Sequence, residues 1–540
     1  MRSSLRAALI ALLWLVAAGG SAAPAAAAGP DAADGELLAR GRALYVDGRR
    51  ADGSALVAAR AGGLALAGAE AACANCHRRS GLGSSEGRSY IPPVTAQALF
   101  TAMPVGKGAS AIGAGRPAYT EATLAHALRG GVDASGRPLD FLMPRYQLHD
   151  DDVRALRAYL ASLAVTPAAR EDVVHFATVI APGVARERGE AMVGVLQACF
   201  DDQNAGPQAE RGRRKLAADM VQREGRKWQL HVWNLQGPQD TWGEQLARSA
   251  SRQPVFALVG GVGGAEWAPV HGFCERAGVP CVFPHLEAPV AGAAGYYPLY
   301  LGQGALLEAG LVARHIAQQG RATGRVTQVL REQDPAAQAA AEALQRALSE
   351  HGLASRELRL PAQAPLVPGS LAPVDATETL VLWLRPADLE RLGTLAPPAA
   401  QVYVSATLAQ RDEVPLPPVW KERTLMAYPF ELPQQRARRV APMRQWLQER
   451  GLALADERVQ ADAWVACKAL RTAMAEAEEH LGREYLVERL ESNMERTTAT
   501  GLYPRLALGI GQRFASKTGY LVRFDAASGA LVAVGERVAP

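Results

Sequence analysis

The strongest constraint on this chain is the run from Cys73 to His77, which reads Cys-Ala-Asn-Cys-His. Two cysteines separated by two residues and followed directly by histidine have the spacing for covalent attachment of a c-type haem. Both thiols then reach one edge of the porphyrin, while the histidine turns under the ring to the iron. A redox dithiol or half of a zinc site is the alternative, but no second ligand pair for zinc lies nearby. We therefore expect one haem c on Cys73 and Cys76, with His77 as an axial ligand.

The composition is that of an ordinary globular protein. Charged residues make up 21% and hydrophobic residues 49% of the 540 residues, which excludes long disorder and a membrane bundle. A chain of this length holds roughly two to four domains. The formal net charge of +4 falls to +2 without Arg2 and Arg6, so the basic surface of a nucleic-acid binder is missing and no nucleic-acid partner is expected.

The first 28 residues have the pattern of a secretory signal peptide. Arg2 and Arg6 precede an apolar run over Ala7–Ala18, and small residues follow up to Ala28. The apolar run would span only about 18 Å of helix, against a hydrocarbon core of roughly 30 Å. No cysteine precedes Cys73, which excludes a lipid-modified cysteine just after the leader. We expect a soluble periplasmic protein without a membrane span once residues 1–28 are removed.

The pattern changes near residue 165, and we expect a domain boundary there. Residues 35–165 carry short helical stretches at Gly35–Val46, Glu121–Arg129 and Asp150–Leu163, without strand patterns. The stretch Ala164–Arg170 is a candidate linker. From 172 to 540, strand patterns alternate with helical ones, which predicts a mainly parallel sheet. The size of this region favours two α/β lobes facing a cleft.

The second axial ligand of the haem iron must come from another part of the chain. Four candidates follow the motif: Met103, His126, Met143 and His149. We favour Met143, because it lies in an irregular segment just before the last helical stretch, which can pack as a lid. Met103 is only 26 residues after His77, a short path to the opposite face of a haem.

Residues 35–165 resemble the class I cytochromes c. The resemblance rests on Gly41–Tyr45 in the first helical stretch, on the CxxCH motif, and on Leu156, Tyr159 and Leu160 in the last one. It implies a small all-α domain whose terminal helices cross. It also implies that a proline carbonyl accepts the second ring proton of His77. Pro92 and Pro93 are both candidates, and Pro93 is taken as the site residue. Methionine opposite histidine implies electron relay rather than catalysis.

Residues 172–540 resemble the type I periplasmic binding proteins, especially the branched-chain amino acid group. The resemblance rests on Asp202–Gly206 at the end of the first helical stretch, on the Gly-rich turn Val259–Gly264, and on the strand Val279–Pro284. The same glycines could be read as a dinucleotide loop. However, they lack the GxGxxG spacing and the acidic residue expected at the next strand end, which argues against a nucleotide site.

The chain departs from this group at the positions that imply ligand binding. The resemblance implies hydroxyl side chains after the third and fourth strands, but Gly264 and Ala265 follow the third strand and Glu287 follows the fourth. A carboxylate at Glu287 would repel the carboxylate of an amino acid. We expect Gly264, Glu266 and Glu287 to line a cleft that binds another small molecule, or none.

Four cysteines lie outside the haem motif. Cys274 and Cys281 are seven residues apart across a helix-to-strand turn, and we expect them to form a disulfide in an oxidising compartment. Cys199 and Cys467 lie in separate helical stretches. We favour separate buried thiols there and leave a second bridge open.

These features together predict a monohaem electron-transfer protein and not an enzyme. The second domain would dock a redox partner or sense a ligand, and the resemblance of similar fusions to components of quinoprotein alcohol oxidation suggests a periplasmic quinoprotein dehydrogenase as partner. The alternative is a solute-binding protein of an ABC-type transporter with an accessory haem domain. A haem peroxidase would need an open iron position and a second haem or a radical source, but there is one CxxCH motif.

Overall fold

The computed structural model describes residues 30–539, apart from 61, 87–88, 104–114, 164–171, 215–225, 291–294, 321–324, 395, 411, 413, 478–480 and 498–500. The leader expected at residues 1–28 and the linker expected at Ala164–Arg170 lie outside the described residues. Among the helices in the described ranges, none is both long and apolar enough to cross a membrane.

The chain forms two compact units. The first contains the residues up to Asn75 together with Leu99–Ser162, and the second contains Cys76–Ala98 together with Leu163–Pro540. The chain changes unit within two short helices, α2 (Ala74–His77) and α3 (Ala96–Phe100). Cys73 is therefore grouped with the first unit, whereas Cys76 and His77 are grouped with the second.

Two helices of the first unit pack closely on one another. They are α1 (Pro30–Arg42), which continues as the π-helical turn Ala43–Asp47, and α5 (Asp150–Ser162). Gly41 lies at their contact, where any side chain would collide with the carbonyl group of Ala155. A third helix, α4 (Glu121–Gly130), begins after Thr120, whose hydroxyl accepts a hydrogen bond from the Thr123 amide. All three lie close to the ranges expected from the sequence.

The first unit also contains a small antiparallel sheet. Its strand order is β2 (Ala65–Ala67), β1 (Val57–Ala59) and β5 (Arg145–Tyr146). The expectation of an all-α domain without strands is therefore wrong. Strands this short show no alternation of polar and apolar residues, so the sequence carries no periodic signal for them.

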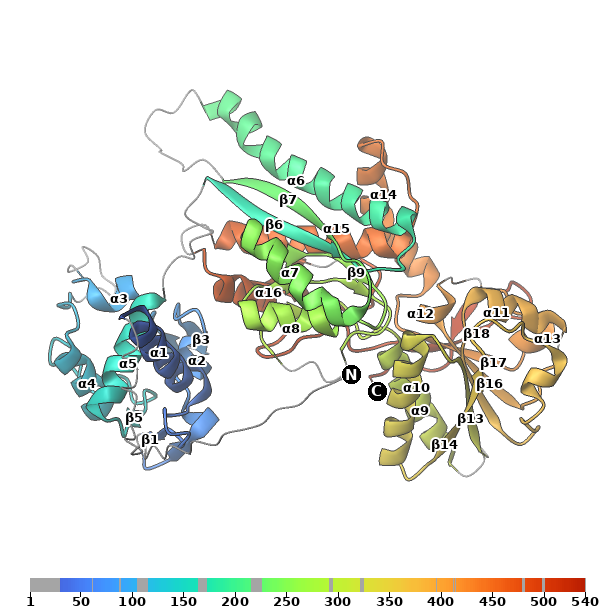
Figure 1. The fold of residues 1–540 in the computed structure, drawn as a ribbon, viewed down its shortest axis with the longest axis horizontal. Coiled ribbons are helices and arrows are strands. Elements are labelled where there is room, and N and C mark those ends of the chain that lie inside the picture. Colours follow the sequence, from blue (N-terminus) through green and yellow to red (C-terminus); the bar gives the residue numbers. More distant parts are fainter. Residues whose placement is uncertain are drawn as a thin grey trace, which may run out of the picture. The chain divides into compact units, whose positions relative to one another are not determined.

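The second unit contains two seven-stranded sheets, which we name sheet A and sheet B (Figure 1). Sheet A is parallel throughout. Its strands, in order, are β11 (His285–Leu286), β9 (Val262–Gly263), β6 (Val173–Ile180), β8 (Ala257–Val259), β10 (Cys281–Val282) and β12 (Pro298–Leu299), with β7 (Lys227–Asn234) paired to β6.

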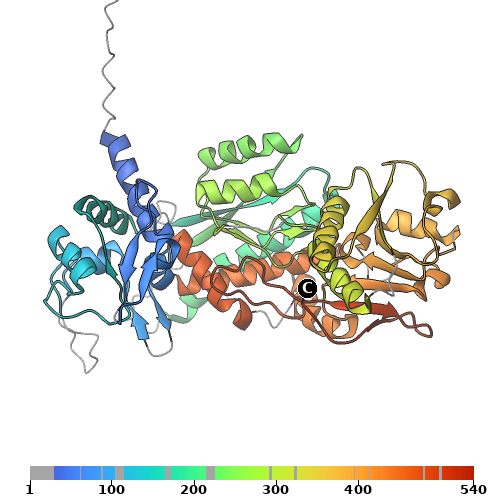
Figure 2. The same ribbon diagram turned by 90° about the horizontal axis from the view of Figure 1, so that it is seen from below.

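Helices cover both faces of sheet A. One face carries α7 (Trp242–Arg252) and α8 (Ala268–Ala277), and the other carries α6 (Arg186–Arg214), α15 (Glu457–Glu476) and α16 (Arg483–Thr497), as Figure 2 shows. A parallel sheet covered on both faces needs almost wholly apolar strands. β8 meets this need, since all three of its residues are buried.

Sheet B has five parallel strands followed by two antiparallel ones. In order they are β14 (Ser355–Leu360), β13 (Val326–Arg331), β15 (Thr379–Trp383), β16 (Gln401–Ser405), β17 (Thr424–Tyr428), β18 (Tyr520–Phe524) and β19 (Leu531–Ala533). The helix α9 (Ala305–Gln319) precedes β13, and α10 (Pro335–Glu350), α11 (Pro386–Arg391), α12 (Ala406–Ala409) and α13 (Pro418–Lys421) lie between the parallel strands along the chain. The alternation of strands and helices is the one that the sequence predicted.

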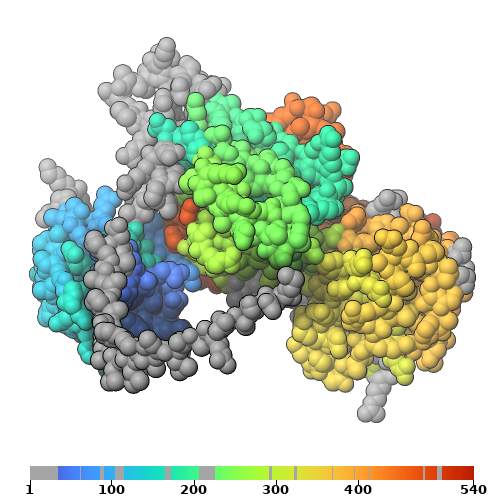
Figure 3. Space-filling model, viewed as in Figure 1, coloured from blue at the N-terminus to red at the C-terminus, as the bar shows by residue number. Residues whose placement is uncertain are grey.

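The chain passes between the two sheets more than once. It leaves sheet A after β12, returns along α14 (Pro433–Glu449) to α15 and α16, and enters sheet B again at β18. Figure 3 shows the residues around sheet A in green and those around sheet B in yellow to orange, as two bodies that touch. A short hairpin of β3 (Ser84–Glu86) and β4 (Ser89–Ile91) also belongs to the second unit.

Two disulfides lie in the second unit. Cys274 is joined to Cys281 with a Cα–Cα distance of 6.2 Å, which is the pairing expected from their spacing. Cys199 of α6 is joined to Cys467 of α15, with 6.6 Å between the Cα atoms. The preference for separate thiols at Cys199 and Cys467 was therefore wrong. Their two helices are neighbours in space although 268 residues separate the cysteines.

We predict that the two disulfides differ in their contribution to stability. Loop-closure entropy assigns about 5 kcal/mol to a bridge with the separation of Cys199–Cys467 and about 2 kcal/mol to one as short as Cys274–Cys281. All four cysteines are buried, so the cavities left by alanine are similar in the two cases. The pair of changes Cys199→Ala and Cys467→Ala should therefore lower the melting temperature more than Cys274→Ala with Cys281→Ala.

Tryptophan fluorescence measures the melting of the second unit, because every tryptophan after Trp14 lies between Trp228 and Trp464. The reduced wild-type protein, in which both bridges are open, is the control. Equal falls in melting temperature for the two double variants would contradict this loop-length argument.

Candidate functional site

His77, at the end of α2, is held in one orientation by a proline carbonyl. Its Nδ1 atom lies 2.9 Å from the carbonyl oxygen of Pro92. The ring is 8% exposed, and burial lowers the pKa of His77 although the bond to Pro92 acts in the opposite direction. A neutral ring that donates from Nδ1 keeps the lone pair of Nε2 for a metal.

The bond to Pro92 depends on a tight turn between the two residues. Gly83 has a φ of +79°, and a side chain there would collide with the Ile91 carbonyl and with Pro92. The Gly83 amide donates to the His77 carbonyl at 3.0 Å, which closes the turn. The expectation of Pro93 as the partner is corrected, because the accepting carbonyl belongs to Pro92. Neighbouring prolines cannot be told apart without the turn geometry.

The remaining residues fit covalent attachment of a haem. The two disulfides use the other four cysteines, so Cys73 and Cys76 are outside both. Cys73 is buried, and its sulfur lies 3.9 Å from the hydroxyl of Tyr146. With His77 next to them, these are the two thiols and the imidazole that a c-type haem requires.

The four candidates for the second axial ligand differ in their exposure. Met103 is 45% exposed, and its sulfur accepts from Arg116 at 3.5 Å. His126 and His149 are exposed, whereas Met143 is partly buried. The Met143 amide donates to Asp140 at 3.1 Å, and its carbonyl accepts from Arg145, so both ends of the residue are fixed. Among the four, Met143 is the least solvated.

The residues that follow His77 are anchored within the second unit by α16. Arg78 has a φ of +63°, an uncommon value for a residue with a side chain, and its guanidinium forms a buried ion pair with Glu491. Ser80 donates to Glu488 from its amide at 2.9 Å and from its hydroxyl at 2.6 Å. Glu491 also pairs with Arg513. Two carboxylates on one helix therefore fix the backbone directly after the histidine.

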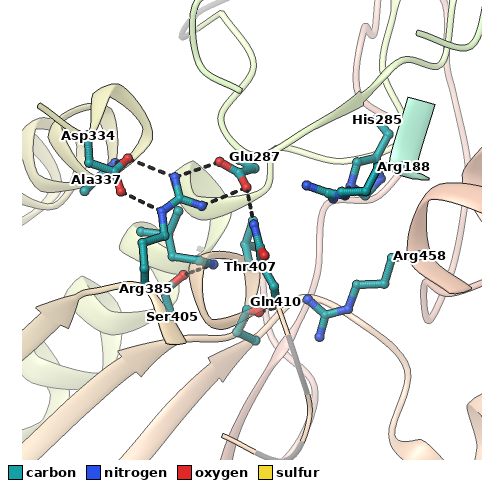
Figure 4. Close-up of polar contacts among 12 residues, drawn as sticks. Arg188, His285, Glu287, Asp334, Ala337, Arg385, Ser405, Thr407, Gln410 and Arg458 are labelled. Atoms are coloured by element: carbon teal, nitrogen blue, oxygen red, sulfur yellow. Dashed lines mark hydrogen bonds and ion pairs between the residues drawn. The ribbon is translucent and has the colours of Figure 1, made fainter. Parts of the chain in front are cut away.

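A second candidate site is a polar pocket of about 40 Å³ between the edges of sheets A and B. Arg188 of α6, His285 of β11 and Arg458 of α15 lie on one side, and Glu287 and Gln410 lie on the other (Figure 4). Each cation is already matched: Arg188 pairs with Asp456 at 2.8 Å, for example. This volume is enough for a few water molecules.

Only one of the three residues expected to line the cleft does so. Glu287 lines the pocket, but Glu266 is exposed and Gly264 faces open space, and neither contributes to the lining. Sequence reasoning missed Arg385, which binds Glu287 at 2.8 Å through each terminal nitrogen. It also missed Asp334 and Gln410. The available signal was position for Asp334 and Arg385, which follow the carboxyl ends of β13 and β15, whereas Gln410 ends the short helix α12.

Comparison with known proteins gives a family for one part of the chain. Residues 53–164 match the family model of cytochrome c. A search of curated protein sequences found no relative.

Several solved structures are similar to about two thirds of this chain at low identity. A possible leucine/isoleucine/valine-binding protein from Rhodopirellula baltica has 16% identity and a TM-score of 0.47, and the match covers 68% of this chain and 98% of that one. A branched-chain amino acid ABC transporter protein from Thermus thermophilus with bound valine has 12% identity, a TM-score of 0.48, and coverage of 68% and 97%. A solute-binding protein from Rhodopseudomonas palustris in complex with benzoate has 12% identity and a TM-score of 0.48, and the match covers 68% of this chain and 98% of that one.

At these TM-scores the neighbours decide neither the fold nor a ligand of this chain. The two sheets described above stand on their own strand pairings. The segment that matches the cytochrome c family includes Cys73, Cys76 and His77. Residues 53–164 of this chain match the cytochrome c family, and the same polypeptide also contains an α/β unit built on two sheets.

Proposed function

We propose that this chain is a periplasmic monohaem cytochrome that transfers one electron at a time, with a cytochrome domain at 35–165 and a binding-protein-like domain at 172–540. One observation carries the proposal: the buried His77 ring donates from Nδ1 to the Pro92 carbonyl and so keeps Nε2 for iron. When bound, a haem c exchanges single electrons between its ferrous and ferric states.

The protein residues have distinct roles in this proposal. Cys73 and Cys76 supply the two thioether sulfurs, and the Pro92 carbonyl orients His77 and raises the basicity of its ring. Met143 would hold the iron through its thioether sulfur, which would raise the reduction potential relative to a nitrogen ligand and favour electron transfer over oxygen activation.

The α/β unit is proposed to dock the redox partner, and a quinoprotein dehydrogenase is the partner class that similar fusions suggest. A transport receptor would need an open site for its solute. The pocket here has a volume of about 40 Å³. Purifying the protein from the periplasm with its partners, and recording which of them reduces it, tests the proposal. Failure of every co-purified redox protein to reduce it would overturn the docking role.

We predict that replacing both Cys73 and Cys76 by alanine leaves no haem on the polypeptide after denaturation and acid extraction. Each single change should keep one thioether and therefore a covalent haem with a shifted absorption band. The reason is that the other four cysteines are occupied in disulfides. Absorption of the extracted polypeptide measures the outcome, and covalent haem on the double variant would refute the assignment.

We predict that Met143→Ala abolishes the weak sulfur-to-iron absorption at the red end of the oxidised spectrum. Met103→Ala is the matched control and should leave this band unchanged, because Met103 is 45% exposed while Met143 is partly buried and fixed at both ends. The opposite result would move the axial ligand to Met103. Loss of the band in neither variant would exclude both methionines.

We predict that the protein binds leucine, isoleucine and valine no more tightly than millimolar. A micromolar complex requires about −8 kcal/mol, and the buried ammonium and carboxylate of the ligand must both find fixed partners. Here Arg188, which lines the pocket, is already paired with Asp456, and nearby Arg385 is bound by Glu287 and Asp334. Calorimetric titration of the full-length protein decides the question, and a micromolar heat signal would favour the transport-receptor alternative.

A further inference from the structure

The Arg385–Glu287 contact has the geometry of a bound ligand rather than of a surface ion pair. Nη1 of Arg385 donates to Oε1 of Glu287 and Nη2 donates to Oε2, both at 2.8 Å. The side-chain amide of Gln410 adds a third donor to Oε1 at 2.9 Å. A carboxylate received by a two-pronged guanidinium and an amide is the pattern of specific carboxylate recognition.

The partners of this contact come from both sheets (Figure 4). Glu287 directly follows β11 at the edge of sheet A, and Arg385 follows β15 of sheet B. Asp334, which follows β13, holds the other side of Arg385 through bonds of 2.6 and 2.9 Å. These are carboxyl ends of parallel strands, the place where α/β sheets bind their ligands.

Two residues next to Glu287 have a positive φ. Gln410 has a φ of +57°, an uncommon conformation for a residue with a side chain, and its amide reaches Glu287 from there. Gly304 has a φ of +53°, and a side chain at this position would collide with the carbonyl oxygen of Glu287. The Glu287 carbonyl in turn accepts from the Ala305 amide at 2.8 Å.

Both side chains of the contact, Glu287 and Arg385, are stabilised in their charged forms. Burial alone would raise the pKa of Glu287, but the hydrogen bonds and charge of Arg385 outweigh it and hold this pKa below its usual value. Burial opposes the charge on Arg385 too, yet its bonds to Asp334 and Glu287 raise its pKa well above the usual range. Glu287 is 8% exposed, so little water competes for these bonds.

We propose that Arg385 forms a binding site for a small carboxylate, that the chain fills this site with its own Glu287, and that this internal ligand holds sheet A to sheet B. Closure of the α/β unit then needs no soluble ligand. A site filled from within does not respond to solutes, which suits a docking surface of constant shape.

The test is to empty the site and refill it with acetate. Glu287→Ala should lower the melting temperature of the full-length protein by roughly 5 °C, because Arg385 keeps only Asp334 as a partner. Backbone hydrogen exchange should become faster on both sides of the contact, in residues 284–287 at sheet A and in residues 405–410 after β16 of sheet B. About 100 mM acetate should reverse both changes, measured against sodium chloride of equal ionic strength.

Two further variants separate a filled site from a merely stabilising ion pair. In Glu287→Ala with Arg385→Met the guanidinium is absent, and acetate should have no effect. Asp388→Ala breaks the buried pair of Asp388 with Arg331, which lies wholly at sheet B. It should lower the melting temperature without raising exchange in residues 284–287.

The proposal fails if Glu287→Ala leaves melting and exchange unchanged, or if acetate does not reverse its effects. If the alanine variant does not fold, Glu287→Gln provides the measurement. It keeps the shape but loses the charge, so it should raise exchange at both edges, and wild-type exchange would overturn the proposal. Haem absorption should be unchanged in every variant, so failure here is distinguishable from failure of the electron-transfer proposal.

Discussion

Sheet A depends on helices that come from the far end of the α/β unit. Its last strand, β12, ends at Leu299, yet α15 and α16, which cover one face, begin at Glu457 and Arg483. Without these helices the apolar side of β8 and of α6 would be open to water. The disulfide between α6 and α15 fixes the same contact covalently. Sheet A can therefore reach its final packing only once the chain is present as far as α16, so its packing depends on contacts between residues far apart in the sequence.

Parallel sheets create a second constraint, at the carboxyl ends of their strands. Loops that leave these ends bring polar side chains together in a small space, and each buried charge there needs a partner. Glu287, Arg385 and Asp334 satisfy one another across the two sheets. The same need is met near His77, where Arg78 is matched by Glu491 and Ser80 by Glu488. In both places, the groups that satisfy one another lie far apart along the chain.

The sequence predicted the features that have a local or periodic signal. The long strands β6 and β13 and the helices α4 and α5 follow from apolar periodicity and capping residues, and the haem motif follows from spacing alone. Features that depend on distant contacts were missed or left open. β1 and β5 are too short to show a period, and Cys199 meets Cys467 only through the return of α15.

The site shows the same division between local and distant information. The choice between Pro92 and Pro93 depends on a turn that Gly83 permits, and no spacing rule decides it. The pairing of Arg385 with Glu287 could not be predicted, because neither segment carries a sequence signal that the two strand ends lie next to each other in space. Glu287 itself was identified as a cleft residue, but its charge was interpreted as repelling a ligand rather than as replacing one.

For the exported, haem-bearing chain proposed above, the nested disulfides have a consequence for maturation. The Cys274–Cys281 bridge lies between the two ends of the Cys199–Cys467 bridge along the sequence. A chain that emerges with its N-terminus first presents Cys199 to the oxidising machinery long before its partner arrives. During this interval the nearest later thiols are Cys274 and Cys281, and the earlier ones, Cys73 and Cys76, are needed for haem attachment. Correct maturation then depends on a disulfide isomerase, or on haem attachment that is faster than thiol oxidation.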